Sequence, residues 1–186
     1  MQRRPLSWAQ PIELAGVPNF HKVTESLYRS AQPTLEGMHN LERFGIRTVL
    51  NLRLLHSDAD EVAGTSLMQD HAHLTAWYIH DQDALWFLDM VATREGAPFL
   101  VHCQHGADRT GCMCAMYRMV VQGWPRNEAI REMREGGFGY HELWRNIPTY
   151  LRCVDVEQIR HRLAIGDLKD HRPDPAPPEY DDLEGP

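Results

Sequence analysis

A short stretch near the middle of the chain carries the residues best suited to chemistry. The sequence VHCQHGADRTG, residues 101–111, places Cys103 directly after an apolar run and six positions before Arg109. A buried strand, then a glycine-containing turn, then a helix is the arrangement that points backbone N–H groups at an anion. The same dipoles favour the thiolate form of a cysteine, which is its nucleophilic form. The stretch therefore predicts a cysteine nucleophile in an anion-binding loop.

The residues around Cys103 have expected roles in holding a phosphate group. Arg109 offers a planar guanidinium that can bind two phosphate oxygens at once. Thr110 can donate its hydroxyl to the sulfur, and Gly106 and Gly111 permit backbone angles and close approach that a Cβ would hinder. The alternative, a buried structural cysteine beside a core histidine, rarely produces this whole pattern by accident. The residues expected to surround the phosphate are Gln104, His105, Gly106, Ala107, Asp108 and Thr110.

These residues resemble a known family. HCQHGADRTG matches the His-Cys-x5-Arg-Thr signature of cysteine-based protein phosphatases. The stretch LYRSAQPTLEGMHNLERFGIRTVLNLR resembles their atypical dual-specificity group, found in bacteria, fungi and plants, and the resemblance covers about residues 20–160. It implies a phosphocysteine mechanism with no metal or other cofactor, Cys103 as the nucleophile and Arg109 as the phosphate clamp. It also implies that His102 supports the loop through hydrogen bonds.

The reaction also needs a carboxyl group that protonates the leaving oxygen and then activates water. In the fungal and plant relatives this acid stands at the start of the helix before the signature, a position that Asp81 matches without a gap. Asp83 is the alternative acid, although a helix cap is the favoured explanation for it. Asp108 is expected to line the rim of the loop. Asp58 and Asp60 are expected to form a solvated pair at the start of a helix.

The loop also predicts the kind of phosphate ester. Relatives that act on inositol phosphates carry lysines in this loop, whereas this loop has none and places Asp108 at its mouth. Charge repulsion in a poorly screened cleft would disfavour a polyanion. A phosphorylated protein, with phosphotyrosine first, or a small phosphomonoester is therefore expected. A phosphatase of inositol phosphates and a pseudophosphatase that only binds phosphorylated partners stay open as alternatives. A sulfur-transfer or arsenate-reducing enzyme fits Arg109 and Thr110 less well.

Other conspicuous side chains are interpreted mainly as structural. Arg29 and Arg53 are expected on the surface for solubility rather than as a basic lip. His71 and His73 would share a face of an extended segment, but no cysteine or carboxylate spacing completes a metal site, so no metal is expected. Three tryptophans are expected to be core anchors rather than substrate-stacking residues. They are Trp77, Trp86 and Trp144.

The remaining cysteines raise a redox question. Cys112 and Cys114 lie on the helix after the loop and are expected to be small core residues. Either could instead act as a resolving thiol that protects Cys103 from irreversible oxidation, and this alternative stays open. Cys153 is interpreted as structural.

Strand and helix signals alternate along the chain. A helix is expected over 35–44, capped by Thr34 and ended by Gly45. Strands are expected over 46–53, 74–79 and 97–102, with a loop and a modest helix within 56–71. Further helices are expected over 83–96, 109–122, 125–137 and 140–164. This order predicts an α/β fold with a mostly parallel central sheet flanked by helices.

Length and composition predict a single domain and exclude some partners. The 186 residues are divided into an N-terminal extension (1–19), a phosphatase domain (20–165) and a disordered, Pro-rich acidic tail (166–186). The formal net charge of −7 argues against nucleic-acid or anionic-membrane binding. Four cysteines without the spacing of a secreted scaffold favour the cytoplasm. No transmembrane segment or signal peptide is expected, and a monomer is favoured.

Overall fold

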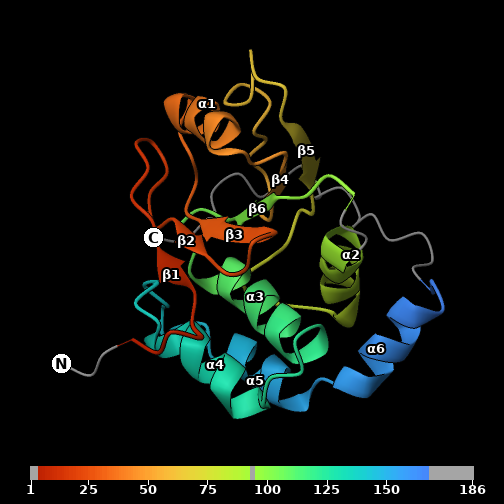
Figure 1. The fold of residues 1–186 in the computed structure, drawn as a ribbon. Coiled ribbons are helices and arrows are strands. Elements are labelled where there is room, and N and C mark those ends of the chain that lie inside the picture. The colour runs from red at the N-terminus through yellow and green to blue at the C-terminus, as the bar shows by residue number, and fades with distance from the viewer. Residues whose placement is uncertain (1–3, 93–94, 168–186) are drawn as a thin grey trace.

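The computed structural model describes residues 4–92 and 95–167, which form a central sheet with helices on both faces (Figure 1). Four strands run parallel, and two short antiparallel strands extend one edge. The predicted α/β class is confirmed. In spatial order the strands are β1 (Gln10–Pro11), β2 (His21–Lys22), β3 (Leu27–Ser30), β6 (Phe99–His102), β4 (Thr48–Asn51) and β5 (Met68–His71).

One helix covers one face of the sheet, and the remaining helices gather on the other (Figure 1). The helix α1 (Leu35–Phe44) has the predicted bounds, because Thr34 Oγ1 accepts from Gly37 N and Gly45 ends the helix at a φ of 108°. The other helices are α2 (Asp81–Ala92), α3 (Asp108–Val120), α4 (Arg126–Glu135), α5 (Asn146–Cys153) and α6 (Val156–Ala164).

Successive side chains of a strand point to opposite faces of the sheet. Because helices cover both faces, the central strands are buried on both sides. On β4, Val49 packs into the cluster under α1, whereas Leu50 packs into the larger cluster under the other helices. Leu100 and Val101 divide between the two clusters in the same way on β6. Burial on both faces explains why these strands appear in the sequence as continuous apolar runs.

The register brings the carboxyl ends of three parallel strands together. Ser30 at the end of β3 and Asn51 at the end of β4 both pair with His102 at the end of β6. In parallel α/β sheets, ligands bind in the crevice beyond the carboxyl ends of the strands. Cys103 follows His102 directly, so the sheet places it in that crevice.

Several predicted elements are wrong. The strand expected over 74–79 does not form, and residues 72–80 are irregular. β4 lies between β6 and β5. The sequence of β5, MQDH, is polar and largely exposed, so hydropathy does not indicate a strand there. Turns replace the modest helix expected within 56–71. The helix expected over 140–164 is divided into α5 and α6, and Asp155 caps the second of these.

The predicted core tryptophans divide into two kinds. Trp86 and Trp144 pack against the larger cluster, as expected. Trp77 is 45% exposed and Tyr78 is 62% exposed, so the prediction of a core role for Trp77 is wrong. These two aromatic side chains belong to the irregular segment 72–80.

Residues 9–14 pack against the rest of the folded unit. Gln10 and Pro11 pair with β2, and Ile12 and Leu14 pack against the cluster under α1. Ala9 donates its backbone N–H to Glu132 on α4. The expected tail falls almost entirely on 168–186, outside the described residues.

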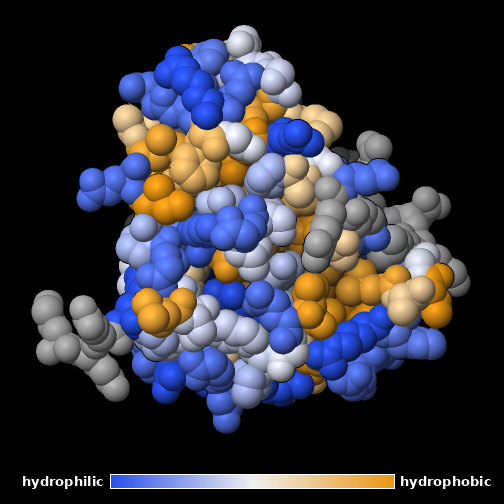
Figure 2. All heavy atoms as spheres, viewed as in Figure 1, coloured by the Kyte–Doolittle hydropathy of each residue, from blue (hydrophilic) through white to orange (hydrophobic). Residues whose placement is uncertain are grey.

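The surface in this view is mainly hydrophilic over α1 and around α4, with smaller hydrophobic areas between them (Figure 2). In the described part of the chain, no helix is both long enough and apolar enough to cross a membrane.

Candidate active site

The loop between β6 and α3 has free backbone donors. The helix α3 has Ala107 at its N-cap position, with no side chain capping it. Within the described residues, the backbone N–H groups of residues 104–107 donate no hydrogen bond. An uncapped helix N-terminus combined with free N–H groups is a preformed anion site.

The carbonyl groups at the centre of the same loop are bound from outside it. Each of three successive carbonyl oxygens accepts a hydrogen bond from a group that does not belong to the loop. Because the carbonyls are tied outward, the intervening N–H groups are left to line the concave side, as in other anion-binding nests. The three bonds are Gln32 N to Gln104 O (3.1 Å), Asn19 Nδ2 to His105 O (2.9 Å) and Arg29 Nη2 to Gly106 O (2.6 Å).

Gly106 is required at its position for two reasons. Its φ is +67°, a conformation that residues with a side chain rarely adopt. A Cβ there would lie 2.3 Å from Ser30 O and 2.5 Å from Ala31 N, which are backbone atoms of the neighbouring strand end. The loop can therefore pack against β3 only with glycine at this position.

Arg29 supports the loop, and the prediction that it is a surface residue is wrong. It is 1% exposed, it donates to Gly106 O, and its guanidinium lies 3.7 Å from the centre of the Phe138 ring. It lies on β3, a strand that the sequence reading did not identify.

Cys103, the first residue of the loop, and Thr110 in the first turn of α3 are both buried. Cys103 is 2% exposed and Thr110 is fully buried. Among the described residues, Thr110 Oγ1 has no hydrogen-bond partner, so the donation expected from Thr110 to the sulfur is not present in this structure. A buried hydroxyl without a partner is costly unless a ligand uses it.

Arg109 lies in the first turn of α3 and is half-buried. Its Nη1 donates to the carbonyl of Leu74 at 3.2 Å. The irregular segment 72–80 therefore borders the loop, and the Asn146 amide holds this segment by donating to Ala76 O. The exposed Trp77 and Tyr78 belong to the same segment.

His102, the residue before Cys103, forms a buried pair with Asp58. His102 Nε2 lies 2.7 Å from Asp58 Oδ2, and the two side chains are 0% and 1% exposed. Gln32 donates to the other oxygen of Asp58 at 2.8 Å. Burial alone would raise the pKa of Asp58, but the bond and charge of His102 outweigh it and hold that pKa below its usual value. The prediction that Asp58 is solvated is wrong, whereas Asp60 is exposed as expected.

Replacing Asp58 with asparagine is expected to cost about 1–3 kcal/mol of unfolding free energy at pH 7, because a charged hydrogen bond in the interior is lost. A carboxyl group with a lowered pKa stabilises the fold above its unfolded value, near pH 4, and loses this contribution as the pH falls through its folded value. The difference between wild type and Asp58→Asn should therefore shrink below about pH 4 in urea unfolding experiments. Asp60→Asn is the exposed control and should change little. If the difference in unfolding free energy between wild type and Asp58→Asn did not change with pH, a charged Asp58 paired with His102 would be contradicted.

Asp108 is not a free group at the rim, contrary to prediction. It is 5% exposed, and both of its oxygens contact His141. Oδ1 accepts from His141 N at 3.0 Å, and Oδ2 lies 2.8 Å from His141 Nδ1. This engagement leaves Asp108 poorly placed to deliver a proton. Sequence reasoning missed His141, which follows α4 and carried no motif.

The two acid candidates stand at the start of α2. Asp83 is the third residue of α2 rather than its N-cap, and its Oδ2 accepts from the His80 backbone N–H at 2.8 Å, as the third residue of a capping box does. Burial raises the pKa of Asp83, and the His80 bond opposes the rise only in part. Asp81 is the first residue of α2 and is half-buried. Burial, then the nearby Cys112 and Asp81, raise the pKa of Tyr150, whose buried hydroxyl has no hydrogen-bond partner among the described residues. The choice of Asp81 as the acid stays a prediction.

The other cysteines differ in burial. Cys112 and Cys114 are buried and unpaired. Burial raises the pKa of both thiols, so they stay protonated and are slow to attack an oxidised Cys103. Cys153 is exposed. A resolving role for Cys112 or Cys114 is therefore disfavoured.

His71, His73 and Arg53 all make hydrogen bonds within the protein. The rings of His71 and His73 stack with centres 3.7 Å apart, and they contact the carbonyls of Arg53 and Leu54 respectively. Arg53 is half-buried and donates to Gln32 Oε1 at 3.3 Å. Arg53 thus lies beside the network of Gln32 and Asp58 rather than on open surface.

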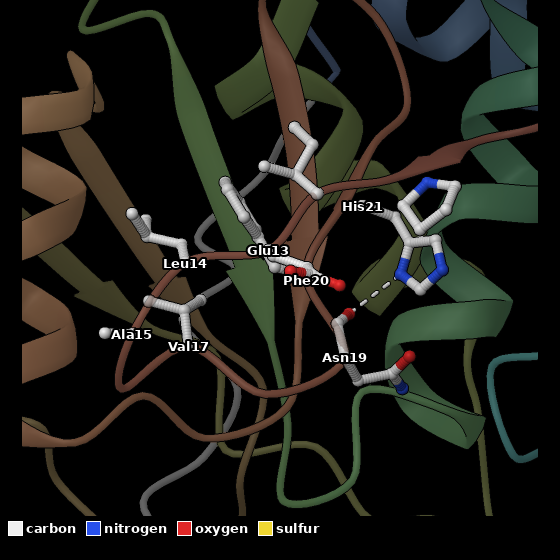
Figure 3. Close-up of a pocket in the computed structure, with 9 residues that line it drawn as sticks. Glu13, Leu14, Ala15, Val17, Asn19, Phe20 and His21 are labelled. Carbon is white, nitrogen blue, oxygen red and sulfur yellow. Dashed lines mark hydrogen bonds between the residues drawn. The ribbon is translucent and has the colours of Figure 1, made fainter.

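A separate hollow of about 530 Å³ lies along residues 11–21 (Figure 3). The figure shows Leu14 and Val17 on one side and Asn19 at the end near His21, with the Asn19 carbonyl accepting from His21. The hollow has no nucleophile. Its contribution to the site is Asn19, whose amide holds His105 O and Phe138 O.

The comparison with known families agrees with this geometry. The sequence matches the family described as "DSP-PTPase phosphatase fused to NAD+ Kinase" over residues 14–143, more than half of the chain. The chain belongs to this family and is therefore a cysteine-dependent phosphatase of the dual-specificity group. The predicted family, enzyme class and phosphomonoester hydrolase activity are thereby confirmed.

Individual relatives place it more closely. Dual specificity protein phosphatase TpbA of Pseudomonas aeruginosa PAO1 is 35% identical over 172 residues, which cover 91% of this chain and 77% of that protein. The TpbA crystal structure superimposes with a TM-score of 0.79 at 32% identity and covers 87% of this chain and 99% of that chain. A cysteine-to-serine variant of TpbA in complex with pTyr gives the same values. The catalytic domain of the PP-IP phosphatase SIW14 of S. cerevisiae shares the fold, with a TM-score of 0.71 at 20% identity, covering 84% of this chain and 98% of that chain.

Proposed function

We propose that the protein hydrolyses phosphotyrosine in phosphorylated proteins, and other phosphomonoesters more slowly, through a phosphocysteine on Cys103. The observation that carries this proposal is the loop around Cys103. Three of its carbonyls accept hydrogen bonds from outside the loop, and four of its N–H groups have no acceptor among the residues that the structure describes. These donors, together with the Arg109 guanidinium, match the three equatorial oxygens of a transferring phosphoryl group.

The reaction proceeds in two displacements. The Cys103 thiolate attacks phosphorus, the bond from phosphorus to the ester oxygen breaks, and Asp81 gives its proton to that oxygen. Asp81 then takes a proton from water as the water attacks phosphorus, and the S–P bond breaks to release inorganic phosphate and the thiolate. The hydrogen bond between His102 and Asp58 fixes the end of β6, next to Cys103. Thr110 supplies a donor for the sulfur as it leaves.

Two observations support phosphotyrosine as the substrate. A relative that is 32% identical has been crystallised in complex with pTyr. The exposed Trp77 and Tyr78 belong to the segment that borders Arg109, where aromatic faces can pack on a tyrosine ring. The expected repulsion of polyanions by Asp108 carries less weight, because that carboxylate is buried against His141.

The substrate is tested with a matched panel. A phosphotyrosine peptide, its phosphoserine counterpart and inositol hexakisphosphate are compared by phosphate release. We expect kcat/KM for the phosphotyrosine peptide to be at least about tenfold higher than for the other two, because the ring adds apolar burial. Trp77→Ala should lower this value for the phosphotyrosine peptide and leave the phosphoserine peptide unchanged. If the inositol phosphate were hydrolysed fastest, the assignment of phosphotyrosine as the substrate would be wrong. Binding of the phosphotyrosine peptide without any hydrolysis would favour a pseudophosphatase.

A further inference from the structure

Three metal-binding side chains meet at the edge of the phosphate loop. His105 belongs to the loop, Asp108 begins α3, and His141 lies between α4 and α5. Each offers one ligand atom, and these three atoms all lie within 4.8 Å of one another. These residues form no recognisable metal-binding motif in the sequence, because His141 is far from the other two along the chain. Only the fold brings the second histidine to the loop.

The spacing of the two rings fits a single tetrahedral ion. With Zn–N bonds of about 2.1 Å, the centres of two imidazole rings bound to one ion lie about 5 Å apart. The rings of His105 and His141 are 5.1 Å apart and inclined at 67°. Asp108 Oδ2 and His141 Nδ1, now 2.8 Å apart, would need to separate to about 3.3 Å. The His141 side chain is 41% exposed, so it has room to move by this amount.

The surroundings prepare these groups to bind a metal. Asp108 Oδ1 accepts the backbone N–H of His141, which fixes the carboxylate from behind as an outer-shell contact does in metal sites. A buried carboxylate and two histidines form a donor set typical of Zn²⁺ and similar ions.

We propose that His105, Asp108 and His141 form a binding site for a divalent transition-metal ion, preferentially Zn²⁺, at the entrance to the phosphate loop. Three protein ligands leave a fourth position for water or for an oxygen of bound phosphate. Because His105 belongs to the loop, an ion held there alters access to Cys103. The site thus offers metal control of the phosphatase.

A second group with metal-binding side chains serves as the internal control. His56, Asp58 and Glu61 are similarly close to one another. This group has a single histidine, and both oxygens of Asp58 are already bound by His102 and Gln32. A metal there would have to break the buried pair, so His56→Gln is not expected to weaken metal binding.

The test uses the full chain carrying Cys103→Ser, so that the nucleophilic sulfur cannot bind the metal. Co²⁺ serves as the spectroscopic probe for Zn²⁺, and its binding is followed by visible absorption. We expect one Co²⁺ per chain with bands of nitrogen and oxygen ligation, displaced by Zn²⁺. His105→Gln and His141→Gln, each added separately, should weaken binding about tenfold or more. His56→Gln should leave it unchanged.

Three results would overturn the site: equal affinity in both loop variants, a loss caused by His56→Gln, or an absorption band from sulfur to Co²⁺. Circular dichroism of each variant shows whether it is folded. In the active chain, Zn²⁺ should inhibit wild type at least about tenfold more strongly than His141→Gln. Because the binding assay uses the Cys103→Ser chain, its failure would leave the proposed phosphatase mechanism standing.

Discussion

Cys103→Ser is expected to lower phosphate release from the phosphotyrosine peptide by on the order of 10,000-fold or more. A serine hydroxyl is not ionised near neutral pH and cannot replace the thiolate as nucleophile. The N–H groups of residues 104–107 and the Arg109 guanidinium are unchanged, so the peptide should still bind with a similar Kd by titration calorimetry. The measurement therefore separates chemistry from binding.

Cys153→Ser provides the matched control, because Cys153 is the exposed cysteine outside the loop. Its turnover should equal that of wild type. If Cys103→Ser kept turnover within tenfold of wild type, another residue would have to be the nucleophile.

Asp81→Asn is expected to slow hydrolysis of a phosphate ester with a poor leaving group by about 100-fold to 10,000-fold. An ester whose leaving group is already acidic needs little protonation, so its first step should be nearly unaffected. For the poor leaving group, the fall in kcat/KM with rising pH reports loss of the protonated acid, and this fall should disappear in the variant. Steady-state rates across the pH range provide the measurement.

Asp83→Asn distinguishes the two acid candidates. Asparagine keeps an oxygen for the His80 N–H, so the start of α2 is preserved. We expect Asp83→Asn to retain wild-type dependence on the leaving group. If Asp83→Asn shows the large loss and Asp81→Asn does not, the roles of the two aspartates are reversed.

The parts of the site that depend on contiguous residues could be predicted from sequence. Residues 102–111 carry the proposed nucleophile, the proposed phosphate clamp and Gly106 within one short stretch, so their spacing already defines the loop. The helix α1 was equally local, because Thr34 and Gly45 mark its two ends. In both cases the decisive contacts lie within a few residues of one another.

The supporting residues depend on tertiary structure and could not be predicted. Asp58 lies 44 positions from His102 and Arg29 lies 77 positions from Gly106, yet each pair is joined by a hydrogen bond. Charged side chains are assigned to the surface by default, and only the packing of β3 and β4 around β6 reverses this. The prediction of a strand over 74–79 was wrong for the opposite reason. This segment is apolar, but part of its apolar surface borders the active site instead of packing within the sheet.

The most direct test is to isolate the phosphocysteine itself. Asp81→Asn is mixed with an ester of a good leaving group, so that the first displacement proceeds while the second lacks its base. Acid quenching during the first turnover, followed by peptide mass spectrometry, then locates the phosphoryl group. We predict that it lies on Cys103 and that the Cys103→Ser chain carries none. A phosphoryl group on any other residue, or an unmodified Cys103 during turnover, would contradict the account.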